Sequence, residues 1–279
     1  MKALFLDLAR TVVEFEPGYH NEMGSYLRSA GYCISDRDVF REIARQRAWL
    51  PITPFHGSTN ALDFASLFET LTGEIPDSES LSELNEVGVT SQLCRLYTDI
   101  PPFLERAREE GMKIVLIGDP TDRRLDIVKN LGLDEMVDGA AYAFGAGLPR
   151  RGSDVFRIAE RLAGSKGTYI GDSYEVDSVD ADSAELPFIL IDRDDYYGDV
   201  RANKARSAGD VFDRLTKTDS IQKVAPGQTY DYISSPAESY PGWGRETELG
   251  TQVLDRLTNS GPNSISRRKI VTRRYLGQA

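Results

Sequence analysis

Four aspartates draw attention because three of them end short runs typical of buried strands and the fourth follows one of these closely. Asp7, Asp119 and Asp172 each end one such run, and Asp177 follows five residues after Asp172. Two carboxylates about 4 Å apart repel each other by roughly 4 kcal/mol at an effective dielectric near 20, so a cation would stabilise a cluster of them. Mg²⁺ prefers oxygen ligands and commonly binds few protein carboxylates. The alternative is that each aspartate caps the helix after its strand, but Asp7 together with the pair Asp172 and Asp177 favours a metal site.

Buried strands and amphipathic helices alternate along the chain and would position these aspartates. Short apolar runs predict strands at 3–8, 113–117, 167–170 and 187–191. Apolar residues at helical spacing predict helices at 101–111, 125–131 and 155–162. This alternation predicts an α/β fold, a Rossmann-like, doubly wound parallel sheet in which ligands bind at the carboxyl ends of the strands.

The chain divides by pattern into three parts. Residues 1–15 and 99–217 form the predicted α/β core, and residues 16–98 have helical spacing and predict a helical cap inserted into it. Residues 218–279 are rich in proline and glycine and predict a partly irregular C-terminal extension with one short helix at 249–257. The two histidines and two cysteines, His20, His56, Cys33 and Cys94, fall in the insert without a partner at motif spacing. We expect packing or surface roles for them.

Composition excludes several classes of protein. The formal net charge is −11, which argues against broad nucleic-acid binding; the exception is the basic tail 265–279, with five Lys or Arg and no acid. No apolar run approaches the roughly 18 residues of a membrane span, and Asp7 interrupts the N-terminal apolar stretch, so we expect a cytoplasmic protein without a signal peptide. Two cysteines and two histidines are too few for a disulfide framework or a zinc site, and any metal would therefore be bound by oxygen.

Two segments together resemble the motifs of a known family. Residues 5–11, Phe-Leu-Asp-Leu-Ala-Arg-Thr, and residues 170–177, Ile-Gly-Asp-Ser-Tyr-Glu-Val-Asp, resemble the first and fourth motifs of the haloacid dehalogenase (HAD) superfamily. The resemblance covers roughly residues 1–217, including a helical cap between the first and second motifs. It implies a hydrolase of the phosphatase type acting on a small phosphorylated molecule.

The resemblance also implies roles for individual residues. Asp7 matches the nucleophile that forms an aspartyl phosphate, and Thr11 matches the residue that closes the turn after it. Asp172 and Asp177 match the acids that hold Mg²⁺, with Asp7 and the backbone carbonyl of Ala9 completing the metal ligands.

Four positions depart from the family pattern. The second aspartate, which protonates the leaving group, is replaced by Ala9, and this general acid is typically worth about 10² to 10⁴ in rate. Arg10 replaces a glycine, and its cation would either reach a phosphate or block its entrance. Gly118 and Asp119 stand where a phosphate-binding Ser or Thr is expected, and an acid there would repel a phosphate. Arg150 matches the motif lysine and keeps its charge, although two surface arginines, Arg150 and Arg151, are an equal alternative.

These departures leave several functions open. Ala9 also occurs in phosphonoacetaldehyde hydrolases, which need a cap lysine, but no lysine lies between Lys2 and Lys113, so we reject that activity. The metal-free dehalogenase branch is a weak alternative. The main hypothesis is a Mg²⁺-dependent hydrolase with Asp7 and Arg150 as catalytic residues and Arg10, Thr11, Gly118 and Asp119 around the substrate. Its rivals are a catalytically impaired HAD-like protein that binds a ligand or protein, and an interaction protein that acts through the basic tail.

Overall fold

The computed structural model describes residues 2–49, 62–87, 93–118, 122–142 and 152–218. By its internal contacts the chain separates into two units, Met1–Arg214 and Leu215–Ala279. The fold below is that of the first unit. The predicted C-terminal extension and its basic tail lie outside the described residues, and so do Asp119, Arg150, Arg151 and His56.

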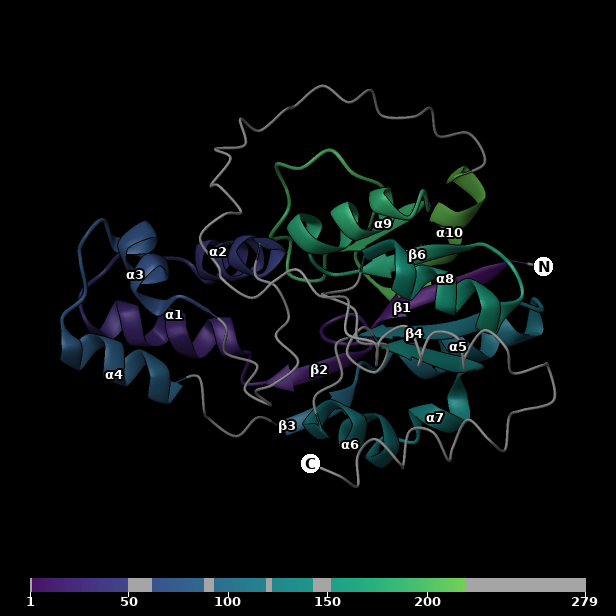
Figure 1. Ribbon diagram of the computed structural model, residues 1–279, viewed down its shortest axis with the longest axis horizontal. Coiled ribbons are helices and arrows are strands. Elements are labelled where there is room, and N and C mark those ends of the chain that lie inside the picture. The colour runs from purple at the N-terminus through teal and green to yellow at the C-terminus, as the bar shows by residue number, and fades with distance from the viewer. Residues whose placement is uncertain (1, 50–61, 88–92, 119–121, 143–151, 219–279) are drawn as a thin grey trace, which may run out of the picture. The chain divides into compact units, whose positions relative to one another are not determined.

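A six-stranded parallel sheet forms the centre of this unit, in the order β5-β4-β1-β6-β7-β8. Figure 1 labels three of its strands, β4, β1 and β6. Its strands are β1 (Ala3–Asp7), β4 (Lys113–Gly118), β5 (Gly139–Tyr142), β6 (Gly167–Gly171), β7 (Phe188–Ile191) and β8 (Lys204–Ala205). The α/β Rossmann-like class is confirmed, as are the four predicted strands. Strands β5 and β8 were not predicted from the sequence.

The core has several helices, all of which lie between strands in the chain except the last, which follows β8. They are α5 (Ile100–Glu109), α6 (Asp122–Asn130), α7 (Leu133–Met136), α8 (Gly152–Ala163), α9 (Val179–Ser183) and α10 (Ala208–Thr218), with a π-helical turn η2 (Tyr174–Ser178) before α9. Helix α5 begins with prolines in its first turn, where the missing N–H has no helical partner to lose. The predicted helix 101–111 therefore exists, with its end two residues earlier.

One face of the sheet buries a cluster of large side chains against α8. Phe5 and Tyr169 on neighbouring strands contact Phe156 of α8, with ring centroids 6.4 Å and 4.8 Å from it. Successive strand residues point to opposite faces, so Leu4 and Leu6 are buried on the other side of β1. Burial on both faces explains why β1 reads as a continuous apolar run.

The insert between β1 and α5 begins and ends with an antiparallel two-stranded ribbon. This ribbon consists of β2 (Val13–Glu16) and β3 (Leu93–Leu96), which the sequence analysis had assigned to the end of the core and to the helical insert. Between them lie α1 (Tyr19–Ser29), α2 (Asp36–Trp49), α3 (Phe64–Thr72) and α4 (Ser78–Val87).

The four insert helices have a hydrophobic cluster of their own. Met23 and Leu27 of α1, Leu67 of α3 and Leu84 of α4 are completely buried in it. Helix α3 is capped by Asp63, whose side chain accepts a hydrogen bond from the backbone N–H of Ser66. The helical character expected for this part of the chain is therefore present, and its role as a cap stays a prediction. Among the described residues, no helix has the length and apolar character needed to cross a membrane, and a cytoplasmic location also stays a prediction.

Candidate active site at the carboxyl edge of the sheet

Asp7 and Asp172 lie at the same edge of the sheet. Asp7 is the last residue of β1 and pairs in register with Ile117 of β4, while Leu6 pairs with Ile170 of β6. Asp172 follows two residues after Ile170, and neighbouring strands are about 4.8 Å apart. Asp7 is buried, with only 5% of its surface exposed. The structure thus brings the nucleophile candidate and one metal-ligand candidate to the edge at which this type of sheet binds ligands.

The turn after Asp7 places Arg10 in a left-handed conformation. Arg10 has φ 61°, and its backbone N–H donates to the Val13 carbonyl at 2.7 Å. A residue with a Cβ in this conformation costs about 1–2 kcal/mol, which explains why glycine suits the position. A strained residue persists only where its surroundings hold it. The side-chain contacts of Arg10 supply that support.

The guanidinium of Arg10 lies directly against the Asp172 carboxylate. Its Nε donates to Asp172 Oδ2 at 3.0 Å, and its Nη2 donates to Asp194 Oδ2 at 2.7 Å. Its Cζ is 4.4 Å from the ring centroid of Phe40 and 5.7 Å from that of Tyr196. Burial lowers the pKa of Arg10, but the negative charges of Asp172 and Asp194 outweigh this, and the pKa ends above its usual value. Arg10 is therefore a fixed cation within the site.

Asp177 supports the loop after β6 from inside. Its residue is 1% exposed, its Oδ1 accepts from the Tyr169 hydroxyl at 2.7 Å, and its Oδ2 accepts from the Ser173 backbone N–H at 2.8 Å. Gly171 has no room for a side chain, because a Cβ there would overlap the Asp177 carboxylate. Gly171 and Asp177 of the predicted motif are thus packed together, and Asp177 holds the loop that carries Asp172.

The remaining candidate residues are placed around the turn and the neighbouring strand end. Ala9 forms an isolated bridge with Val13, and Gly118 is the last residue of β4. The Thr11 hydroxyl is buried and has no hydrogen-bond partner among the described residues, while the Thr11 carbonyl accepts from Arg193 at 3.1 Å. Ala9, Thr11 and Gly118 therefore lie near the carboxyl edge. Asp119 and Arg150 cannot be placed, because they are outside the described residues.

The described carboxylates are not arranged for a divalent cation. In the part of the chain that the structure describes, no group of three or more His, Cys, Asp or Glu residues could hold a metal ion. Asp172 Oδ2 is bonded to Arg10, and both oxygens of Asp177 accept hydrogen bonds from protein groups. The set expected for Mg²⁺, which is Asp7, the Ala9 carbonyl, Asp172 and Asp177, does not fit the ion in this arrangement.

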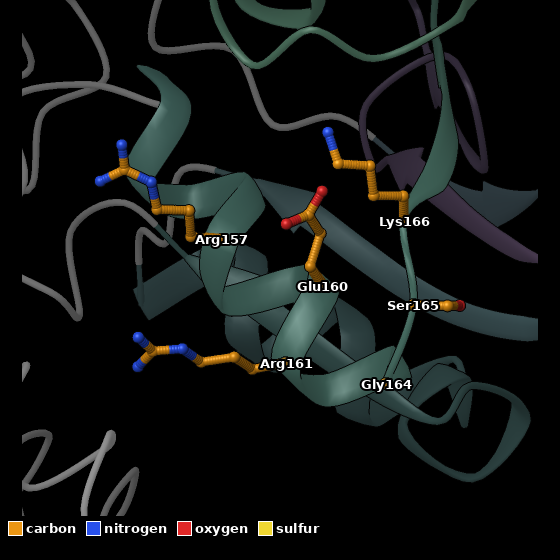
Figure 2. A pocket seen from close by; sticks show the side chains of 6 residues that line it. All are labelled: Arg157, Glu160, Arg161, Gly164, Ser165 and Lys166. Carbon is orange, nitrogen blue, oxygen red and sulfur yellow. The ribbon is translucent and has the colours of Figure 1, made fainter.

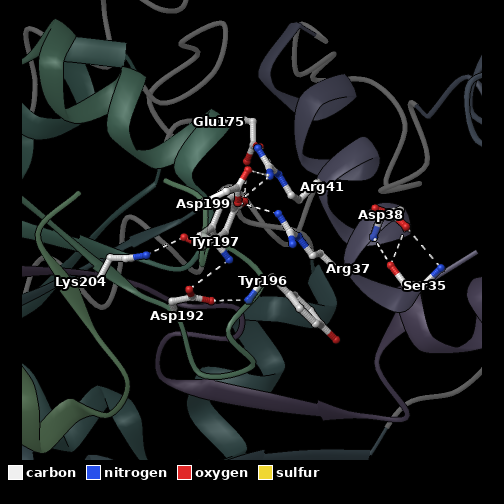
Figure 3. A network of polar contacts seen from close by, with 10 residues as sticks. All are labelled: Ser35, Arg37, Asp38, Arg41, Glu175, Asp192, Tyr196, Tyr197, Asp199 and Lys204. Carbon is white, nitrogen blue, oxygen red and sulfur yellow. Dashed lines mark hydrogen bonds and ion pairs between the residues drawn. The ribbon is translucent and has the colours of Figure 1, made fainter. Parts of the chain in front are cut away.

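Ion pairs join helix α2 of the insert to the core beside this site (Figure 3). Arg41 donates to Glu175 at 3.2 Å and to Asp199 at 2.8 Å, and Arg37 also donates to Asp199, at 2.6 Å. The Tyr197 hydroxyl donates to Glu175 at 2.5 Å. Because Glu175 lies three residues after Asp172, these contacts connect α2 to the loop that carries the Arg10 partner.

His20 completes the surroundings of Arg10 on the side of the insert. Its Nε2 is 3.5 Å from Arg10 Nη1 and 3.1 Å from the Tyr196 hydroxyl, and its ring packs edge-on against Phe40. Burial and, to a smaller extent, the positive charge of Arg10 lower the pKa of His20 to about 3, against the opposing effect of Asp194 and Asp36. The imidazole is therefore neutral. The packing role expected for His20 agrees with its 4% exposure.

Because His20 is neutral in the folded protein, we expect the protein to lose stability in mild acid. The unfolded chain protonates His20 below a pKa of about 6.5 whereas the folded chain does not, so the unfolded state gains stability as the pH falls. The contribution of the neutral His20 to the free energy of unfolding is complete above about pH 6.5. It decreases as the pH falls toward the folded pKa of about 3. Between pH 7 and pH 5 the free energy of unfolding of the wild type should fall by about 1–2 kcal/mol more than that of His20→Gln. Urea denaturation at both pH values measures this difference, and parallel pH profiles would contradict the prediction.

Several residues of this site were missed by sequence reasoning. Asp194, Phe40, Tyr196 and Tyr97 match no motif, although a run of charged and aromatic residues directly after β7 was a signal for two of them. Tyr97 adjoins the cluster. Burial and the negative charges of Asp172 and Asp194 raise its pKa to about 12, against the opposing effect of Arg10 and Arg193. Its phenol is therefore neutral.

A shallow hollow of about 320 Å³ lies elsewhere on the core (Figure 2). Arg157, Arg161 and Lys166 line it together with Glu160, and Lys166 immediately precedes β6. The hollow is therefore at the amino end of that strand, opposite the edge that carries Asp172. It is not part of the candidate active site.

Comparison with known proteins finds similarity in structure only. No protein-family model matches the chain, and no curated protein matches its sequence. A HAD family hydrolase from Deinococcus radiodurans R1, solved with bound phosphate and sodium, has 15% identity and a TM-score of 0.54, over 78% of this chain and 96% of that chain. A predicted phosphoglycolate phosphatase from Haemophilus somnus 129pt has 15% identity and a TM-score of 0.50, over 77% of this chain and 98% of that chain. The chain therefore has the fold of the haloacid dehalogenase (HAD)-like superfamily.

Proposed function

We propose that the chain is a phosphatase-type HAD-like hydrolase in which Asp7 is the nucleophile. One observation carries the proposal. Asp7 is a buried carboxylate at the end of the central strand, at the same edge as Asp172 and next to the turn that holds Arg10. A carboxylate positioned in this way can attack phosphorus and form an aspartyl phosphate, with departure of the leaving oxygen. Water then attacks the phosphoryl group, releasing inorganic phosphate and restoring Asp7.

The substrate is a small phosphorylated molecule with a good leaving group. Ala9 has no proton to give to a leaving oxygen, so esters of alcohols would react slowly. Acyl and aryl phosphates release a carboxylate or a phenolate, which is a stable anion and needs little protonation. Thr11 and Gly118 would contact the substrate at the edge of the sheet. Arg150 and Asp119 keep their expected roles as phosphoryl partner and substrate neighbour. The insert would cover the substrate and exclude water from it.

A second candidate function is favoured by the contact between Arg10 and Asp172. A HAD-like protein that has lost turnover and binds a ligand or a protein would need neither a general acid nor an exposed metal-binding carboxylate. Ala9 and the 3.0 Å ion pair of Arg10 with Asp172 both agree with this alternative. The buried, strand-end position of Asp7 agrees better with the hydrolase.

The two functions are separated by assaying phosphate release from acetyl phosphate, an aryl phosphate and a sugar phosphate. Each substrate is tested in chelator and with added Mg²⁺, and the protein is then examined by mass spectrometry for a phosphoryl adduct on Asp7. We expect activity on the two activated substrates and its loss in Asp7→Asn. Asp134→Asn, which makes the same change on the exposed surface of α7, should keep the activity. Absence of release from every substrate, with no adduct, would support the binding protein.

A further inference from the structure

Arg10 gives the Asp172 carboxylate a permanent positive partner. The donor is Nε, the atom nearest the side-chain stem, and the outer Nη2 is bonded to Asp194 on a different loop. The Arg10 side chain is 21% exposed and that of Asp172 is 13% exposed. Two carboxylates from the loops after β6 and β7 thus face one guanidinium, which is largely withdrawn from solvent.

Aromatic residues fix this guanidinium from its other sides. Phe40 of α2 stacks on it with 4.4 Å between Cζ and the ring centroid, and Tyr196 lies at 5.7 Å. The neutral His20 is 3.5 Å from Nη1 and bonds to Tyr196. A planar guanidinium can stack on a ring while donating hydrogen bonds in its plane, which a lysine ammonium cannot do. Side chains from the insert helices and from a loop of the core therefore hold Arg10 in this place.

A divalent cation and this guanidinium compete for Asp172. Mg²⁺ binds carboxylate oxygens at about 2.0–2.1 Å and needs near-octahedral surroundings, so an ion on Asp172 would lie beside the guanidinium that is bonded to Oδ2. Two cations beside one carboxylate also repel each other, most strongly in a buried site. Asp177 is held inside the loop, where its two oxygens accept from the Tyr169 hydroxyl and the Ser173 backbone N–H.

The backbone conformation at position 10 shows that the turn itself does not favour an arginine. At φ 61° a glycine would be relaxed and an arginine is strained. The conformation of this turn therefore does not require the arginine. What arginine adds is the cation and its contacts with Asp172, Asp194 and Phe40.

We propose that Arg10 is an internal counter-ion that occupies the place of a divalent cation at Asp172, so that the native protein binds such ions weakly at this edge of the sheet. The proposal concerns metal binding alone and does not depend on turnover. It also accounts for the Arg10 departure from the family pattern. If it is correct, removing the guanidinium from the native protein creates a divalent-cation site that the native protein lacks.

The test is a titration of the purified full-length chain with Mn²⁺ alone, followed by electron paramagnetic resonance of the free ion. Arg10→Gly removes the cation and the backbone strain together, and we expect it to gain one Mn²⁺ site at least roughly tenfold tighter than any site of the wild type. Arg10→Gln, which keeps a long polar side chain, should gain the same site if the glycine variant does not fold. Adding Asp172→Asn to either variant should remove it.

A matched control separates a specific site from a change in overall charge. Arg28→Gln deletes a cation that is paired with Asp36 at 2.6 Å within the insert, and it should gain no Mn²⁺ site. The proposal is overturned if the wild type already binds Mn²⁺ as tightly as Arg10→Gly and loses this binding in Asp172→Asn. It is also overturned if both folded Arg10 variants fail to gain a site. Because the readout is ion binding, an absence of phosphatase activity would leave this result unaffected.

Discussion

Ala9→Asp is expected to raise the rate of hydrolysis of alkyl phosphates by about 10² to 10⁴, which is the usual contribution of a general acid. The new carboxyl group would lie two residues after Asp7, on the turn that Ala9 forms with Val13. In its protonated form it can donate to the leaving oxygen while Asp7 attacks phosphorus. An aryl phosphate needs little such help, so its rate should change much less. The ratio of kcat/KM for a sugar phosphate to kcat/KM for an aryl phosphate measures the effect.

Ala9→Asn is the matched control for this gain. The amide has nearly the same shape as the carboxyl group but no acidic proton, so the selectivity for aryl phosphates should remain that of the wild type. The Ala9→Asp variant should also lose activity at high pH, where its new carboxyl group is ionised. An equal gain in both variants would show that the side chain acts by filling space, and no gain in either would remove Ala9 as the cause of low ester hydrolysis.

Asp177→Ala is expected to lower the free energy of unfolding by about 3–5 kcal/mol, because it leaves buried donors without acceptors. The substitution deletes the partners of the Tyr169 hydroxyl and of the Ser173 backbone N–H in a region where Asp177 is 1% exposed. It also removes side-chain volume beside Gly171. The midpoint and slope of urea denaturation measure the change, and an unchanged slope would indicate that unfolding is still cooperative.

Asp182→Ala controls for the removal of one negative charge from the same region. Asp182 is exposed on α9, and its replacement should change the free energy of unfolding by less than about 0.5 kcal/mol. Asp177→Asn should fall between the two, since its carbonyl oxygen can keep one acceptor while its amide group cannot accept from Ser173. A loss below about 1 kcal/mol in Asp177→Ala would contradict the assignment of Asp177 to the support of the loop.

The local pattern of the sequence was sufficient to predict the central strands and the aspartates at their ends. Strands β1, β4 and β7 are largely buried on both faces, and this burial is recorded directly as continuous apolar runs. Strand β6, Gly-Thr-Tyr-Ile-Gly, is less apolar and is marked by Tyr169 and Ile170 before Gly-Asp-Ser. Helices between them require parallel strands, so the ends that carry Asp7 and Asp172 had to meet at one edge. For these strands, the positions predicted from the local pattern agree with those in the tertiary fold.

The shorter strands could not be predicted from local pattern. The two-residue β8 is too short to show a period, and β5, Gly-Ala-Ala-Tyr, has no large aliphatic residue. In the ribbon, the half-exposed β3 pairs with β2 across more than 70 residues of chain. Each of these strands is fixed by hydrogen bonds to a partner strand rather than by its own composition.

At the site, the sequence by itself determined which chemical groups are present, and the tertiary structure decided how they are paired. Asp7, Asp172 and Asp177 could be identified as acids at strand ends, and Ala9 as a missing acid. That Arg10 would bond to Asp172 and Asp194 depended on contacts 162 and 184 residues apart in the chain, and on Phe40 being carried to it by a helix of the insert. The physical reason is that charge pairing depends on distance in space, whereas motif spacing records only the order of residues along the backbone.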